Sequence, residues 1–90
     1  MIEMVETTEV KALSGHRLWL RFSDGSEGVF DLAPILAKGG SMVSALNDPA
    51  MFERVYISFG VPTWPNGFDL DAINLHRQLR EQGLLRRPAA

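Results

Sequence analysis

Residues 61–70 read Val-Pro-Thr-Trp-Pro-Asn-Gly-Phe-Asp-Leu, which places two prolines, a tryptophan and a glycine within one short segment. Proline fixes the backbone angle φ and glycine permits a positive φ, so this composition restricts the chain to few paths. An aspartate at the end of such a segment can cap a following helix. The residues that we assign to the fold are Trp64, Pro65, Gly67 and Asp69 here, and Asp24 and Gly25 in an earlier turn.

Alternating hydrophobicity predicts an antiparallel meander in the first third of the chain. Residues 5–13 are rich in Val and Thr and suit a half-exposed strand. Residues 17–22 alternate strictly, so Leu18, Leu20 and Phe22 share one face of a strand. The other face carries Arg17, Trp19 and Arg21. The Asp-Gly pair at 24–25 suits a tight hairpin turn, which leads to a third strand over residues 27–30.

Three short helices are predicted after the meander. Asp31 can cap the first helix through its carboxylate, and Gly39 can end it. Ser41 can cap a second helix in the same way. Residues 47–49 (Asn-Asp-Pro) interrupt that helix, and residues 50–52 form one further turn.

A strand and a helix complete the predicted elements. Residues 54–60 alternate, with Val55, Ile57 and Phe59 on one face. After the segment at 61–70, an aspartate (Asp69 or Asp71) caps a last helix that runs to about Gln82.

This order of elements predicts an α+β fold with an antiparallel sheet of about four strands. The N-terminal meander and the later strand make the sheet, short helices cover one face, and a helix lies at the C-terminal end. The chain has 90 residues, the size of one domain. We expect a single domain over residues 1–83 and a C-terminal tail, residues 84–90, that is either flexible or packed.

Four short blocks of this sequence resemble those of a small bacterial family. They are residues 22–26 (Phe-Ser-Asp-Gly-Ser), 30–32 (Phe-Asp-Leu), 46–52 (Leu-Asn-Asp-Pro-Ala-Met-Phe, followed by Val55 and Gly60) and 64–70 (Trp-Pro-Asn-Gly-Phe-Asp-Leu). The chain is therefore similar to domain-of-unknown-function family 2442 over residues 5–75. This resemblance implies a small domain without an established activity. Some relatives are suspected of forming toxin–antitoxin pairs with a neighbouring small protein, and others are joined to a helix-turn-helix domain.

The composition disfavours several classes of protein. The chain has no cysteine, so it offers no disulfide and no thiolate. It has no apolar run long enough to span a membrane and no signal-peptide pattern, so we expect a cytoplasmic protein without membrane contact. The formal net charge of -2 gives no general attraction to nucleic acid.

The candidate reactive residues do not form a recognisable catalytic or metal-binding pattern. The available ligands are His16, His76, Asp24, Asp69 and Asp71. Neither histidine has a second histidine three or four residues away, and the aspartates occupy turn and capping positions. No serine lies in a nucleophile elbow. We expect no enzyme, no metal and no cofactor, unless a pocket joins Asp69, His76 and Trp64.

A binding role is the remaining hypothesis. The candidate interface residues are Arg17, Trp19, Arg21, Arg77 and Arg80. The leading hypothesis is a non-enzymatic protein-interaction module, an antitoxin-like member of a small two-protein system. Its partner would be a small protein or a second copy of the chain. The alternative is a nucleic-acid-associated transcriptional regulator, in which Trp19 stacks on bases and the arginines contact phosphates.

Overall fold

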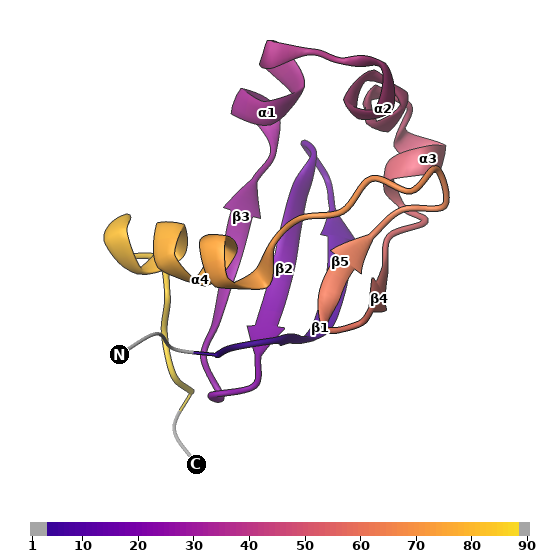
Figure 1. Cartoon of the computed structure of the whole chain (residues 1–90). Helices are drawn as coiled ribbons and strands as arrows, with labels where there is room; N and C mark the ends of the chain where they lie inside the picture. The colour runs from indigo at the N-terminus through magenta and orange to yellow at the C-terminus, as the bar shows by residue number, and fades with distance from the viewer. Residues whose placement is uncertain (1–3, 89–90) are drawn as a thin grey trace.

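The computed structural model describes residues 4–88 of the chain, and its first three strands form an antiparallel meander (Figure 1). The strands are β1 (Thr7–Leu13), β2 (Arg17–Phe22) and β3 (Glu27–Asp31), in the order β1-β2-β3. In this register Leu18 of β2 lies between Ala12 of β1 and Phe30 of β3. The predicted meander is confirmed, and β2 is its central strand.

Short helices gather beyond one end of this sheet (Figure 1). They are α1 (Ala33–Lys38), α2 (Ser41–Ser44), the 3₁₀ helix η1 (Ala45–Asn47) and α3 (Pro49–Phe52). The Asp31 carboxylate accepts the Ala33 N–H at 2.9 Å, but the capping position of α1 belongs to Leu32, which forms no side-chain capping bond, so Asp31 lies one residue before the predicted cap. Ser41 does not cap α2, because it is already the first helical residue; the capping position belongs to Gly40, without a side-chain bond.

A second, two-stranded sheet lies beside the start of β1. It consists of β4 (Tyr56–Ser58) and β5 (Val61–Thr63). The Thr7 N–H donates to the Gly60 carbonyl at 2.7 Å and links the two sheets. The predicted strand over residues 54–60 is therefore too long. Phe59 and Gly60 both have positive φ, at 50° and 75°, and form the turn of this hairpin.

Phe59 contradicts the predicted face of this strand. We expected its ring on the same face as Val55 and Ile57, but its exposed fraction is 101%. An aromatic residue with positive φ is rare, so the sequence contains no signal for a turn at this position. β5 was not predicted either, because a proline within a short segment argues against a strand.

The segment at 61–70 turns the chain from β5 towards the last helix. The Gly67 N–H donates to the Trp64 carbonyl at 2.9 Å, and Gly67 has a φ of 92°. The Trp64 ring is fully buried, and its indole N–H donates to the Phe52 carbonyl at 3.0 Å. These contacts hold the Trp64 turn against α3.

The last helix is α4 (Ala72–Glu81), and its cap is Asp71 rather than Asp69. The Asp71 carboxylate accepts the Ile73 N–H at 3.3 Å, whereas Asp69 forms a β-bridge with Thr63. Leu75 and Leu79 of α4 are buried against the inner face of the meander. That inner face consists of Leu18, Leu20, Phe22 and Phe30.

The structure is therefore α+β, with the predicted sheet divided into three strands and a separate hairpin. The tail is packed where it is described: Leu85 contacts the core, and Arg86 forms a β-bridge with Glu27. Parts of the predicted domain and tail, residues 1–3 and 89–90, lie outside the described residues. Within residues 4–88, none of the helices has the length and hydropathy needed to cross a membrane.

Candidate interaction surfaces

The outer face of the meander carries three of the five predicted interface residues. Arg17, Trp19 and Arg21 alternate along β2 with the buried leucines, so their side chains share the face away from the core. Trp19 is half-buried, and two cations approach its ring at 5.4 Å from the centroid: the Lys11 ammonium and the Arg21 guanidinium. This arrangement is typical of long cationic side chains that cover an indole.

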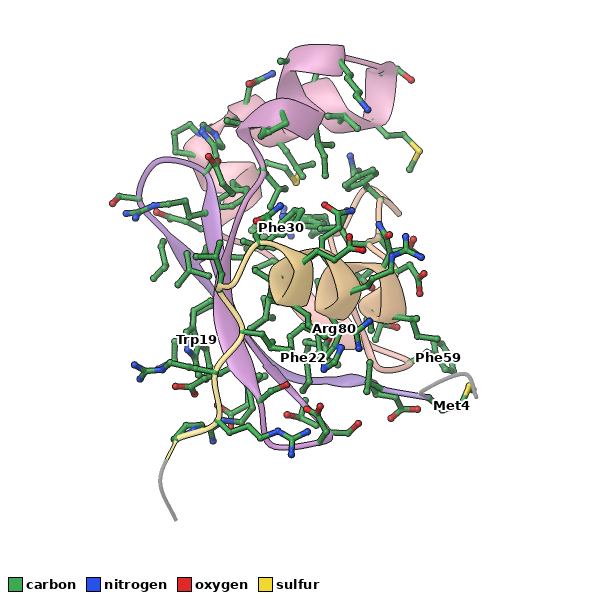
Figure 2. All side chains as sticks on the ribbon, turned by 90° about the vertical axis from the view of Figure 1, so that its left-hand side faces the viewer. Met4, Trp19, Phe22, Phe30, Phe59 and Arg80 are labelled. Carbon is green, nitrogen blue, oxygen red and sulfur yellow. The ribbon has the colours of Figure 1, made fainter. Side chains whose placement is uncertain are left out.

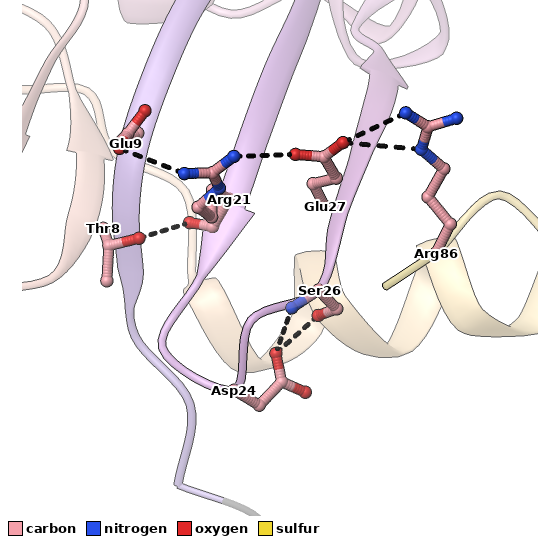
Figure 3. A network of polar contacts seen from close by, with 7 residues as sticks. All are labelled: Thr8, Glu9, Arg21, Asp24, Ser26, Glu27 and Arg86. Carbon is pink, nitrogen blue, oxygen red and sulfur yellow. Dashed lines mark hydrogen bonds and ion pairs between the residues drawn. The ribbon is translucent and has the colours of Figure 1, made fainter. Parts of the chain in front are cut away.

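Two carboxylates pair with Arg21 on this face (Figure 3). The Arg21 guanidinium lies between Glu9, at 3.5 Å, and Glu27, at 3.3 Å. Arg86 of the tail also pairs with Glu27, at 3.3 Å. Glu27 is almost buried, so the two arginines compensate a carboxylate that is largely removed from water. Arg21 is therefore engaged by protein carboxylates on both sides.

The other two predicted interface residues lie elsewhere. Arg77 and Arg80 are exposed on α4, which covers the inner face of the sheet. Figure 2 shows Trp19 on one side of the sheet and α4, with Arg80, on the other. The Arg77 guanidinium donates to the Asn74 side chain. The sheet thus separates the predicted surface into two groups that a flat partner surface cannot contact together.

Asp24 connects three parts of the molecule. In the β2–β3 turn its carboxylate accepts from the Ser26 hydroxyl at 2.5 Å and from the Ser26 N–H at 3.0 Å. The other oxygen lies 2.9 Å from the His76 ring nitrogen of α4 and 3.3 Å from the Arg87 guanidinium of the tail. Burial raises the pKa of Asp24, but the hydrogen bonds from Ser26 and His76 outweigh burial and lower this pKa to about 2.

The structure places the candidate residues Asp69, His76 and Trp64 in different surroundings. His76 is buried against the Phe22 ring and bonded to Asp24, while Trp64 is bonded to Phe52 and Asp69 is exposed. The structure therefore does not bring Asp69, His76 and Trp64 together. Among residues 4–88 there is no group of three or more His, Asp or Glu side chains that could hold a metal ion.

A groove of about 570 Å³ lies beside β3. The floor of the groove is the C-terminal half of β3, at Val29 and Asp31. α1 contributes Ile35 and Lys38 to one wall. α4 and the tail contribute Gln78, Gln82 and Leu84 to the other. Arg17 also reaches the groove, so its lining is apolar and neutral with two cations and one carboxylate.

Comparison with protein families identifies a matching family. The model of a family described as protein of unknown function (DUF2442) matches residues 7–81, which is most of the chain. The chain belongs to the DUF2442 family. A search of curated proteins and a search of solved structures each found no significant match.

The DUF2442 match covers the elements of the structure from β1 to α4. The matched range begins with β1 and ends with α4, so it contains both sheets and all the helices. The blocks that carry the resemblance are the β2–β3 turn, the start of α1, α3 and the Trp64 turn. Within these blocks, Gly25, Gly60 and Gly67 lie in turns with positive φ, and Asp48 caps α3.

Three features of the surface were missed in the sequence. They are the Glu27–Arg86 pair, the Asp24–His76 contact and the groove beside β3. Glu27 and Arg86 are 59 residues apart, and no local pattern connects residues at that separation. The only available signal was the apolar pair Leu84-Leu85, which indicated that the tail could fold back onto the sheet.

Proposed function

We propose that this chain is a non-enzymatic protein-interaction module, the antitoxin-like member of a small two-protein system. The observation that carries the proposal is the groove beside β3. It is built from the four elements β2, β3, α1 and α4 together with the tail, and its wall includes the half-exposed side chain of Leu84. A hollow with apolar walls and few charges suits a binding site.

The chemistry of the lining supports binding rather than catalysis. The Asp31 carboxylate accepts the Ala33 N–H at 2.9 Å, and the Arg17 guanidinium donates to the Ser14 carbonyl at 2.9 Å. Both groups therefore have structural partners within the fold. Gln78 and Gln82 can hydrogen-bond to a partner but do not titrate. The groove thus offers recognition without an evident acid–base pair.

A nucleic-acid-associated regulator is less well supported. Trp19 with its two neighbouring cations would be the stacking platform. Arg21, however, already lies between Glu9 and Glu27, whose carboxylates would repel phosphates. This face is better suited to a partner that offers side chains of both charges.

Affinity purification of the tagged chain from its host tests the proposal, followed by reconstitution with any protein recovered in equal amount. We expect a complex of two purified proteins in size-exclusion chromatography and a micromolar or tighter dissociation constant by calorimetry. In a growth assay, the partner alone should be toxic and co-expression should restore growth. Elution as a monomer or homodimer, or binding to DNA at low salt with a steep salt dependence, would contradict the proposal.

A further inference from the structure

The outer edge of β3 has backbone groups without partners. Glu27 exchanges both of its backbone hydrogen bonds with Arg86, at 2.8 and 2.9 Å, so its N–H and C=O point away from β2. The Ser26 carbonyl accepts from Phe22, and the Leu32 N–H donates to His16 of the segment before β2. In β3, the backbone groups of even-numbered residues therefore bond to β2, and the backbone groups of odd-numbered residues point outward.

This alternation leaves Val29 and Asp31 open. Their N–H and C=O groups point into the groove, and within residues 4–88 these four groups make no hydrogen bond. Figure 1 shows β3 as the last strand of the sheet, with α1 beyond one end of it and α4 crossing near the other. An unpaired strand edge is a template for one more strand.

The tail demonstrates that this edge accepts a strand. Arg86 pairs antiparallel with Glu27, and continuing this register would place Leu84 opposite Val29. Instead, the Leu84 N–H donates to the Leu79 carbonyl at 2.9 Å, so the tail leaves the edge at this point. The chain thus occupies the first part of the edge and leaves the rest for another strand.

A second copy of this chain fits the edge poorly. The open residues lie at the floor of a groove whose walls include Ile35 of α1 and Gln78 of α4. Paired strands must approach to about 4.8 Å. Two copies would each bring these walls to the contact, so their β3 edges could not approach so closely. A single extended segment can enter the groove without this conflict.

The lining predicts the side chains of such a segment. On the core side of the groove are the apolar side chains of Phe30 and Ile35, which pack against the core. Leu84 lines both this groove and the hollow beside Trp19. The outer face of β2 contributes the cation of Arg17, and α1 adds the cation of Lys38, against the single carboxylate of Asp31, which already accepts the Ala33 N–H. Since side chains alternate along a strand, apolar and acidic residues should alternate in the segment.

We propose that an extended segment of a partner protein, with alternating apolar and acidic residues, adds to the outer edge of β3 at Val29 and Asp31. This inference rests on the proposed function, which it deepens by naming how the partner binds. The backbone of the segment bonds to the four open groups, its apolar side chains pack on Phe30 and Ile35 at the core side, and its carboxylates pair with the Arg17 and Lys38 cations of the lining.

The first test uses acetyl-Val-Glu-Val-Glu-Val-Glu-amide as a probe of the ¹⁵N-labelled chain. We expect chemical-shift changes at Val29, Asp31 and Ile35, and about tenfold slower hydrogen exchange of the Val29 and Asp31 amides at saturation. The matched peptide with lysine in place of glutamate should bind about tenfold more weakly. Unchanged exchange and shifts at Val29 and Asp31 at about 1 mM probe overturn the inference.

Two variants connect the binding to the edge. Val29→Pro removes an outward N–H and no bond to β2, so the fold should be retained while the probe binds at least about tenfold more weakly. Leu84→Glu, at a half-exposed position, adds a repelling charge to the wall and should weaken binding similarly. Tyr56→Ala, on β4, is the matched control and should bind the probe like the unmodified chain.

The same variants separate this inference from the proposed function. If the unmodified chain forms a complex with a purified partner and both Val29→Pro and Leu84→Glu keep its affinity, the edge is not the docking site, although the interaction module stands. If no partner is found but the probe protects Val29 and Asp31, the edge inference stands and the two-protein role fails.

Discussion

The two halves of β3 present the same backbone edge in different states. At Glu27 the edge is closed by Arg86, with two backbone hydrogen bonds and an ion pair. Val29 and Asp31 are the next residues of β3 whose backbone groups point outward. There the edge is open and lies in a groove. The covered half contributes two backbone hydrogen bonds to the fold, while the open half leaves backbone groups with which a binding partner can pair.

Removal of residues 84–90 should have the largest effect on stability. Without the tail, the edge of β3 at Glu27 becomes open, like the edge at Val29 and Asp31. The chain loses the half-buried Leu85 side chain and the two backbone bonds of Glu27. We expect the free energy of unfolding in urea to fall by about 2–3 kcal/mol. The Glu27 amide should also lose its protection from hydrogen exchange. An unchanged urea midpoint would show that the tail does not stabilise β3.

Gly28→Ala tests the boundary between the covered and the open half of the β3 edge. A Cβ atom at this position would lie 2.9 Å from the Leu84 carbonyl and 3.2 Å from a Leu79 methyl, so the tail must move. We expect a loss of about 1–3 kcal/mol in thermal or urea unfolding. In the chain without residues 84–90, the same substitution should cost less, because only the Leu79 contact remains. Equal costs in both backgrounds would exclude the clash with the tail.

Acid should destabilise the fold through Asp24, whose carboxylate connects the β2–β3 turn with α4 and the tail. Its pKa is about 2 in the folded chain against 3.8 for an unperturbed aspartate, so its carboxylate stabilises the fold above pH 4. This contribution, at most about 2 kcal/mol, disappears as the pH falls from about 4 to 2. Urea unfolding at several pH values measures the loss. Asp24→Asn should remove this step from the profile, and a variant that keeps it would assign the step to other groups.

Arg86→Ala should have the smallest effect. The arginine side chain is 76% exposed, and Glu27 keeps its contact with Arg21. We expect a loss of less than about 1 kcal/mol that decreases with added salt. A larger, salt-independent loss would mean that the Arg86 stem stabilises by packing rather than by charge.

Local sequence patterns predicted much of the fold. Strict alternation over residues 17–22 placed Leu18 and Trp19 on opposite faces, and the Asp-Gly pair located the β2–β3 turn. The positive φ of Gly67 follows from the turn residues around it. These features depend on neighbours within a few residues, and local propensities describe such features well.

The remaining features depend on contacts between distant residues. No sequence signal predicts that Phe59 is fully exposed with a positive φ. β5 was not predicted because it contains Pro62, and a proline argues against a strand. The groove requires α1, α4 and the tail to meet beside β3, so the sequence suggested Trp19 and the arginines as the surface instead. Sequence periodicity places a side chain on a face, but it does not show what covers that face.

The position of Trp19 gives the chain a built-in optical reporter. The chain has two tryptophans; one is fully buried at Trp64, and the other lines a hollow together with Glu27, Leu84 and Arg86. Their emission should therefore differ in wavelength and in quenching by iodide. In a Trp64→Phe background, the remaining fluorescence would follow the release of the tail from β3, separately from global unfolding.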